Sequence, residues 1–199
     1  PEFVPAYVNA ADTLRTQGRD QESAEMLQQG LQRVPMSATL HHALGLARIR
    51  LQQPDLAMGS FRRAVELDPA TARYSYVYAV ALHSTGQVDE SIRRLQEAVQ
   101  RWPYDREMLM ALTSFQLESG RRQDAQVTAR RLVAAYPADP QVRVLAAQAL
   151  GPKNVLAIKM PYRASSAESL THADLLIERS GIESMTVEIT QRSMVGIIW

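Results

Sequence analysis

Cysteine is absent from this sequence of 199 residues, which excludes disulfides and thiolate metal sites. Its absence leaves either redox compartment open, and a soluble, cytoplasmic protein is the expectation. No apolar run approaches the ~20 residues that span a membrane, so no membrane partner is predicted. The formal net charge of +1 gives no general attraction to nucleic acid, so a nucleic-acid partner is not predicted either.

An initiating methionine is also missing, because the chain begins at Pro1. We interpret the chain as a fragment of a longer protein, so the missing signal peptide carries no weight. The hydrophobic content of 46% is enough for a core, and the length allows one large or two small domains.

The feature that organises the chain is a proline that recurs every 34 residues. These prolines are Pro1, Pro35, Pro69, Pro103 and Pro137. A period of 34 is typical of a helix–turn–helix repeat. It divides the chain into units 4–37, 38–71, 72–105 and 106–139, followed by a final helix over 140–150. Residues 1–150 are thus predicted to form one helical array, and residues 151–199 a separate segment.

Aligning the units shows small residues where two helices of a pair must approach closely, and large apolar residues where a core must be filled. The eighth position holds Ala11, Gly45, Ala79 and Thr113, the twentieth Ser23, Ala57, Ser91 and Ala125, and the twenty-fourth Leu27, Phe61, Leu95 and Ala129. With this pattern the array resembles the tetratricopeptide repeat (TPR) family. The resemblance implies a mainly all-α fold, a right-handed superhelix of antiparallel helix pairs. At position 11, where the family usually has an aromatic residue, Arg48 and Gln116 are expected to weaken the packing.

Local signals agree with the repeat. Glycines are predicted to end first helices at Gly18, Gly86 and Gly120. Aspartates are predicted to cap second helices at Asp20, Asp55 and Asp89, and later helices at Asp105 and Asp139. The alternation of Tyr74, Tyr76 and Tyr78 imitates a strand, but the repeat phase places these residues on a helix.

By resemblance to the family, positions 2, 5, 9 and 12 of each unit line an inner groove. The candidate peptide-binding residues are Val8, Asp12, His42, Leu46, Ile49, Arg73, Tyr76, Val80, His83, Met110, Ser114 and Leu117. This largely apolar set suits an extended segment or a helix with a few apolar anchors. The carboxylate clamp of chaperone-binding relatives needs Lys at position 5, which no unit has.

Two features allow a sharper interpretation than a solvated surface. Adjacent His41 and His42 suggest a metal, but neighbouring helical side chains point about 100° apart and cannot share an ion. Arginine pairs suggest phosphate binding, but they fall on second helices among acidic residues, so a solvated outer face is favoured. These pairs are Arg62–Arg63, Arg93–Arg94, Arg121–Arg122 and Arg130–Arg131. We therefore expect no metal, no cofactor and no catalytic residue.

The composition changes after Gly151. Residues 1–150 contain only two isoleucines and no lysine, whereas the last 49 residues contain six isoleucines and two lysines. Apolar runs at Val155–Met160 and Met185–Ile189, with an amphipathic helix over about 168–180 between them, predict a β-α-β appendage. The stretches Ala149–Leu156, Met160–Leu170 and Gly181–Thr190 resemble ammonia-dependent NAD synthetases. The resemblance implies that Met160, Arg163 and Ser165 lie near a nucleotide.

The glycine-rich loop that binds pyrophosphate in that family is missing from this chain, because the residues where it should stand are repeat sequence. We interpret the chain as a chimera: a protein–protein interaction scaffold without catalysis of its own. The alternative is a remnant of an NAD synthetase with weak nucleotide binding. The uncharged run Met194–Trp199 is expected to pack on the last helix of the array or to pair with another copy, and a homodimer formed through the C-terminal tail is the hypothesis.

Overall fold

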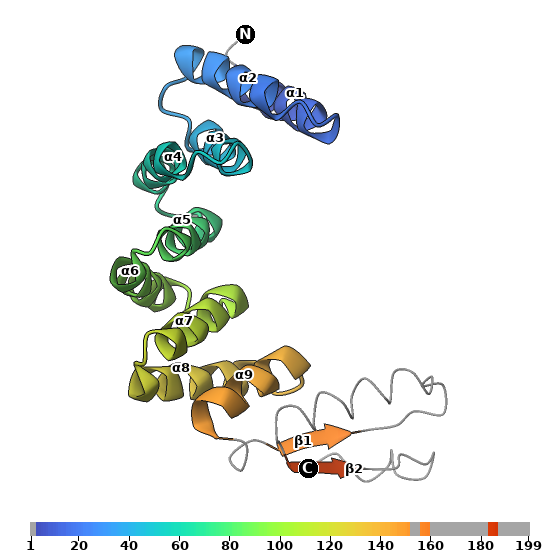
Figure 1. Ribbon diagram of the computed structural model, residues 1–199, viewed down its shortest axis with the longest axis vertical. Helices are drawn as coiled ribbons and strands as arrows, with labels where there is room; N and C mark the ends of the chain where they lie inside the picture. Colours follow the sequence, from blue (N-terminus) through green and yellow to red (C-terminus); the bar gives the residue numbers. More distant parts are fainter. Residues whose placement is uncertain (1–2, 152–155, 160–182, 187–199) are drawn as a thin grey trace. The chain divides into compact units, whose positions relative to one another are not determined.

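The computed structural model describes residues 3–151, 156–159 and 183–186 (Figure 1). The chain divides into two compact units, Pro1–Met108 and Leu109–Trp199, and each is described by itself. The predicted domain boundary near residue 150 falls inside the second unit and stays a prediction. None of the described helices is long and apolar enough to cross a membrane.

The helices follow the repeat phase. The first helix of each unit has 13 residues, and these helices are α1 (Val4–Thr16), α3 (Ala38–Arg50), α5 (Ala72–Ser84) and α7 (Arg106–Glu118). The second helix has 14 residues, and these helices are α2 (Asp20–Arg33), α4 (Pro54–Leu67), α6 (Val88–Arg101) and α8 (Arg122–Ala135). The chain continues into α9 (Pro140–Leu150). Every first helix begins at the predicted first residue of its unit, and the all-α helix-pair array is confirmed.

The turns inside the helix pairs confirm the predicted glycines. Gly18, Gly86 and Gly120 have φ of +74°, +81° and +75° just after the first helices. A left-handed residue at this point ends a helix, and glycine adopts it without a Cβ penalty. In the second pair, however, the equivalent residue is Gln52, with φ of +57°. A side chain there costs backbone energy that the other three turns avoid.

The predicted aspartate caps of the second helices are wrong. Asp20 is the first residue of α2, while Asp55 and Asp89 are the second residues of α4 and α6. The capping positions hold Arg19, Gln53 and Gln87, and none of them makes a side-chain cap bond. The carboxylates instead lie in the first turn, where they interact favourably with the positive end of the helix dipole.

Two other aspartate caps are confirmed. Asp105 accepts a hydrogen bond from the backbone N–H of Met108 at 2.9 Å. Asp139 accepts from the N–H groups of Gln141 and Val142, and Pro140 occupies the first helical position of α9, where its missing donor is not needed.

The core of the first unit lies between the paired helices. In α3 and α4, Gly45 makes room for the buried ring of Phe61, because a Cβ on Gly45 would lie 2.5 Å from a Phe61 ring carbon. In α5, Tyr78 is buried while Tyr74 and Tyr76 are partly exposed. These tyrosines lie on a helix, as the repeat phase predicts, and their strand-like alternation has no structural counterpart.

Position 11 is better packed than the sequence indicates. Arg48 donates from Nη1 to the Leu56 carbonyl at 3.0 Å and to Ser60 Oγ at 2.7 Å. Gln116, in the fourth repeat unit, is only 2% exposed and accepts a hydrogen bond from Thr128. Both polar side chains therefore bond to the partner helix of their own pair, and the expected weakening is offset.

In the second unit, strands β1 (Leu156–Lys159) and β2 (Glu183–Thr186) pair in parallel, with Leu156 opposite Glu183. Strand β2 begins two residues before the predicted run Met185–Ile189, whose later residues lie outside the described part. Residues 160–182, where the crossover helix is predicted, also lie outside it. The β-α-β appendage as a whole therefore stays a prediction.

Candidate protein-binding face

The candidate residues in the first compact unit, Pro1–Met108, lie on the first helices of neighbouring repeat units. Helix α1 contacts α3, and α3 is joined to α5 by a 3.2 Å hydrogen bond between Thr39 Oγ1 and the Tyr74 hydroxyl. We call this surface the first-helix face, and its residues are Val8, Asp12, His42, Leu46, Ile49, Arg73, Tyr76, Val80 and His83. None of them is buried, and Asp12, Ile49 and Arg73 are exposed. The structure thus brings these predicted residues to one accessible surface.

The remaining predicted residues lie on α7 in the second unit. Met110, Ser114 and Leu117 are all partly exposed. Leu117 packs against the alanine cluster between α8 and α9, so it contributes to the core as well as to the surface.

The centre of the first-helix face is aromatic. The His42 ring lies 4.8 Å from the Tyr74 ring and 5.9 Å from the Phe61 ring. Burial, and to a lesser degree the nearby positive charge of Arg73, lowers the pKa of His42 to about 4. His42 Nδ1 has no hydrogen-bond partner within the described part of the chain. At neutral pH His42 is therefore an uncharged ring that behaves as part of an apolar surface.

Charged residues border this aromatic centre. Arg73 and Glu107 approach to 3.9 Å while their side chains remain 60% and 58% exposed. Burial raises the pKa of the Tyr76 hydroxyl, and the carboxylate of Glu107 raises it further, so Tyr76 stays neutral and can donate a hydrogen bond. Exposed ion pairs of this kind are weak, so their partners can be exchanged for charges on a ligand.

Tyr74 was missed by the sequence analysis as a member of this face. Its ring lies tilted beside His42 and its hydroxyl bonds to Thr39, yet it occupies position 3 of its repeat unit, outside the four positions that the family resemblance assigns to the groove. The signal for it was the tyrosine cluster itself.

The two adjacent histidines do not converge on one point. His41 Nε2 is 3.0 Å from the carbonyl oxygen of Pro35, whereas the His42 ring packs between aromatic rings. Among the described residues, no three metal-ligating side chains come together.

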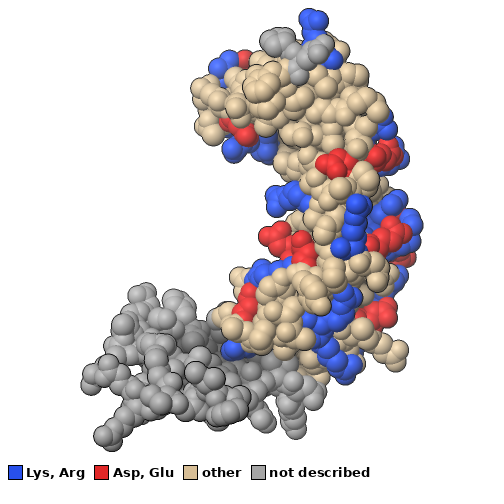
Figure 2. Space-filling model, turned by 180° about the vertical axis from the view of Figure 1, so that it is seen from behind, with Lys and Arg blue, Asp and Glu red and all other residues tan. Residues whose placement is uncertain are grey.

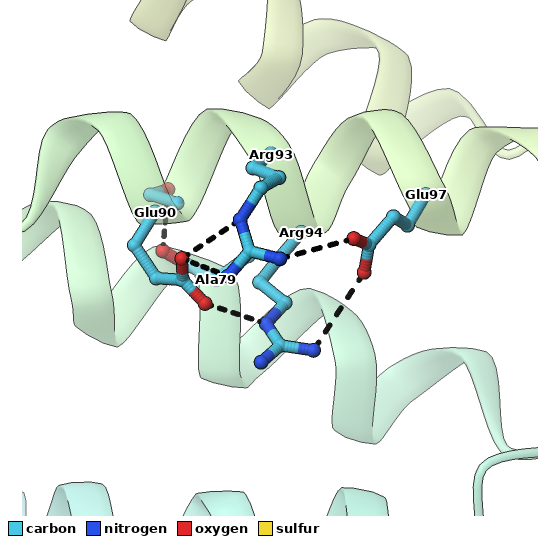
Figure 3. A network of polar contacts seen from close by, with 6 residues as sticks. Ala79, Glu90, Arg93, Arg94 and Glu97 are labelled. Atoms are coloured by element: carbon cyan, nitrogen blue, oxygen red, sulfur yellow. Dashed lines mark hydrogen bonds and ion pairs between the residues drawn. The ribbon is translucent and has the colours of Figure 1, made fainter.

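Several arginines of the predicted pairs have acidic partners. On α6, Arg93 and Arg94 each pair with both Glu90 and Glu97, forming the network in Figure 3. Arg63 pairs with Glu66 at 3.0 Å, and Arg121 and Arg131 also have interaction partners. Figure 2 shows acidic and basic side chains interspersed over the face that it draws. This arrangement fits the solvated-face interpretation better than a phosphate-binding one.

The residues predicted to bind a nucleotide are not among the described ones. Met160, Arg163 and Ser165 all lie outside the described residues, as does the run Met194–Trp199 on which the predicted tail-mediated dimer depends.

Comparison with known families separates the chain into two regions. Models of the tetratricopeptide repeat match residues 8–70, 42–106 and 82–149. A model of NAD synthase matches residues 140–195. The two regions overlap over 140–149, so α9 fits both families.

Curated NAD synthetases match a short stretch of the chain. The NH(3)-dependent NAD(+) synthetase of Chlorobium phaeovibrioides is 62% identical over 47 residues, which is 24% of this chain and 17% of that enzyme. The enzyme of Fusobacterium nucleatum is 53% identical over 49 residues, 25% of this chain and 19% of that enzyme. The chain thus spans less than a fifth of the length of these relatives.

Solved structures match the helical array. PilF of Pseudomonas aeruginosa has a TM-score of 0.63 and 24% identity, with 73% of this chain and 67% of PilF covered. A MamA structure has a TM-score of 0.66 and 16% identity, and the match covers 98% of this chain and 96% of MamA. YrrB, described as a TPR protein with an unusual peptide-binding site, has a TM-score of 0.63 and 16% identity, with 89% and 86% covered. At these identities the likeness concerns the fold alone.

Proposed function

Because the chain belongs to the tetratricopeptide repeat family over residues 8–149, we propose that it is an interaction scaffold that binds a protein segment on the first-helix face. The segment is an extended peptide or a helix, and the chain performs no catalysis of its own. We expect no nucleic-acid or membrane partner.

The observation that supports this proposal most directly is the exposure of apolar side chains on α3 and α5. Ile49 is 37% exposed, and Leu46, Tyr76 and Val80 are partly exposed around the neutral His42 ring. A partner side chain that covers them gains hydrophobic and aromatic contacts, which are the usual anchors of helix and peptide recognition. The structural relative YrrB, described as having a peptide-binding site, sets a precedent for peptide binding on this fold.

The test compares the full chain with its double variant Leu46→Ala and Tyr76→Ala on a peptide array. Hits are measured again in solution by fluorescence polarisation. We expect the variant to lose at least tenfold in affinity, because both anchors are removed from the centre of the face. Circular dichroism must show unchanged helicity, since Leu46 also packs against the core of α4 and α5.

The matched control is Leu56→Ala. Leu56 is 54% exposed on the second helix α4, so its truncation removes a similar apolar side chain away from the first-helix face. Affinity should stay within twofold of the wild type. If the double variant binds as well as the wild type, the ligand does not use this face and the proposal fails.

A second candidate function rests on the high identity of the C-terminal region to NAD synthetases. It is a remnant that retains weak nucleotide binding through Met160 and Arg163, with affinity of about millimolar order. Adenylation needs the ATP phosphates held by backbone donors and cations, and the sequence lacks the loop that holds them in that family. We expect ATP-dependent NAD formation from the deamido precursor and ammonia to equal the blank without protein. Turnover that Arg163→Ala abolishes would favour an enzyme.

Self-association is a separate part of the proposal. The uncharged run at Met194–Trp199 is the segment expected to join two copies. Light scattering on the full chain and on a variant that ends at residue 193 tests this: the full chain should have twice the mass of the shortened one. Equal masses at the same concentration contradict tail-mediated dimerisation.

A further inference from the structure

A hollow of about 660 Å³ opens between α2, α3 and α4 in the first unit. Its polar lining includes Gln28, Gln32, Arg48 and Arg63, and its apolar lining includes Leu31 and Leu44. Among the described residues, no carboxylate lines it. The hollow is therefore a partly apolar site with a positive charge, made entirely by residues of one compact unit.

The hollow lies on a different side of α3 from the first-helix face. His41, Leu44 and Arg48 line the hollow, whereas His42, Leu46 and Ile49 belong to the first-helix face. With 100° per residue, the two sets point roughly 130–150° apart around the helix axis. A ligand in the hollow would leave the first-helix face free.

Arg48 is a partly buried cation without a counter-charge. Its Nη1 donates to the Leu56 carbonyl and to Ser60 Oγ, and no ion pair is formed with it in the described part of the chain. Burial lowers the pKa of its guanidinium, and no neighbouring carboxylate opposes that effect. Since a guanidinium has five N–H donors, those on Nε and Nη2 remain for a ligand.

Arg63 is a lesser contributor to the charge. It pairs with Glu66 at 3.0 Å and donates to Met36 Sδ at 3.3 Å. Both members of the ion pair are largely exposed, so Glu66 offsets the charge of Arg63 but does not reach into the lining.

The repeat provides a comparison inside the same chain. One unit later, an equivalent hollow between α4, α5 and α6 measures about 150 Å³. There Arg94 replaces Ser60 and lies over the Tyr78 ring at 6.0 Å, and Glu97 replaces Arg63 and adds a carboxylate. Leu82 stands in the place of Arg48. The later hollow is thus partly filled and neutralised by its own side chains, and the earlier one is not.

We propose that the hollow between α2, α3 and α4 binds an aspartate or glutamate side chain of a protein partner, with an adjacent apolar residue against Leu31 and Leu44. A planar carboxylate matches the fork of donors that Arg48 leaves open. A single unpaired guanidinium balances one negative charge, which favours a carboxylate over a doubly charged phosphate. The amides of Gln28 and Gln32 add neutral donors to the lining.

The test is an NMR titration of the full chain that follows the Arg48 Nε–H signal. The probe is the capped peptide acetyl-Ala-Leu-Glu-Leu-Ala-amide, and its matched control has Gln in place of Glu. Two further arms use inorganic phosphate and the Gln peptide with a free C-terminal carboxylate. The Glu peptide should shift the signal and bind at least tenfold more tightly than each of the other three.

Two variants locate the effect. Arg48→Leu places at position 11 the residue that units one and three carry as Leu14 and Leu82, and Ser60 keeps its hydrogen bond to the Leu56 carbonyl, so the fold should tolerate the change. Binding to this variant, followed by the backbone amide signals that the Glu peptide shifts in the wild type, should be lost. Gly59→Glu supplies a competing carboxylate at a lining position where an added Cβ meets nothing within 4 Å. It should weaken binding at least tenfold relative to Gly59→Gln, which differs only in charge.

The proposal is overturned if the Glu and Gln peptides bind equally, or if Arg48→Leu binds as tightly as the wild type. A phosphate response as strong as that of the Glu peptide also overturns it, because the hollow would then be an unselective anion site. An equal response to the terminal carboxylate would overturn the assignment to a side chain.

Discussion

The Gln116 side-chain oxygen accepts a hydrogen bond of 2.9 Å from the hydroxyl of Thr128, and so joins α7 to α8. Both residues are buried, with 2% and 6% of their surfaces exposed. They occupy positions 11 and 23 of the fourth repeat unit, the same positions that Arg48 and Ser60 occupy in the second repeat unit. A polar residue at position 11 is thus matched by a hydroxyl twelve residues later.

In the first and third repeat units, the hydrogen bond between the paired helices lies at other positions. Their position 11 is leucine, and the bond between the paired helices comes from Ser23 to the Ala11 carbonyl at 2.8 Å and from Ser91 to the Ala79 carbonyl at 2.7 Å. Each helix pair therefore has a side-chain hydrogen bond between its helices, and its location alternates along the array. The bond fixes the pair's register, because a slip would leave a buried polar group unsatisfied.

The first prediction concerns the buried pair of α7 and α8. Thr128→Val keeps the shape of the side chain but leaves the Gln116 amide without its hydroxyl donor. The free energy of unfolding should fall by about 1–3 kcal/mol, the cost of an unsatisfied buried polar group. Urea unfolding followed by circular dichroism measures it.

The control for that prediction removes both partners. Gln116→Leu combined with Thr128→Val should restore most of the lost stability, since replacing both polar groups by apolar ones is nearly neutral. If the double variant is as unstable as the sum of the single variants, the two side chains are not coupled and the interpretation of position 11 is wrong.

The second prediction concerns Gly45 and Phe61. A Cβ on Gly45 would lie 2.5 Å from the ring, so Gly45→Ala should lower the unfolding free energy by about 1–3 kcal/mol. Adding Phe61→Leu reproduces the Ala–Leu combination of Ala11 with Leu27, and it should cancel part of that loss. Thermal unfolding of the two single variants and the double variant gives the coupling between the sites.

Gly59→Ala is the matched control for the same substitution on the next helix. Gly59 is helical and an added Cβ there meets nothing within 4 Å, so alanine should raise stability by about 0.5–1 kcal/mol. If both glycine variants change stability in the same direction, close packing on Phe61 does not explain Gly45.

The third prediction concerns the turn between α3 and α4, in which a glutamine stands where the other turns have glycine. Gln52 has φ of +57°, where its sibling turns have glycine, so Gln52→Gly should stabilise the chain by about 0.5–1 kcal/mol. The reverse change, Gly18→Gln, should destabilise it by about 1 kcal/mol, although nothing lies within 4 Å of the added Cβ. Differential scanning calorimetry measures both. A destabilised Gln52→Gly would mean that the glutamine side chain makes a needed contact.

The sequence predicts the array well because one period connects every helix to its neighbours. First helices begin at Val4, Ala38, Ala72 and Arg106, the predicted unit starts. Fine detail is less accessible. The misassigned caps at Asp20, Asp55 and Asp89 are wrong by one or two residues, because a carboxylate is favourable both at a cap and in the first turn, and only the backbone distinguishes them.

The candidate site shows a similar division. The repeat phase brings the predicted face residues to one surface, but the role of each depends on contacts across units that the period does not encode. Tyr74 and the unpaired Arg48 were missed for this reason. In the second and fourth repeat units, positions 11 and 23 are both polar, as Arg48 with Ser60 and as Gln116 with Thr128. Comparing these two positions across the repeat units therefore predicts the Arg48–Ser60 bond.

The last prediction concerns pH. The pKa of His42 is lowered from 6.5 to about 4 in the folded chain, so the unfolded chain binds the extra proton first as the pH falls. Stability should therefore be complete above pH ~6.5 and should decline as the pH falls from ~6.5 to ~4. The loss that this ring contributes should be about 1–2 kcal/mol, because the ring is partly exposed and recovers some solvation when charged.

The measurement is the urea midpoint at a series of pH values for the wild type and for His42→Met, which carries the residue found at position 5 of the fourth unit. The variant should lose the part of the slope between pH ~6.5 and ~4 that comes from this ring, while other groups continue to titrate. Tyr74→Phe is the control, because it keeps an aromatic ring beside His42 and removes only the hydroxyl bonded to Thr39, so the slope should remain. If His42→Met has the same slope as the wild type, the imidazole is not held neutral by its place between the aromatic rings, and the apolar centre of the first-helix face would have to be assigned to other residues.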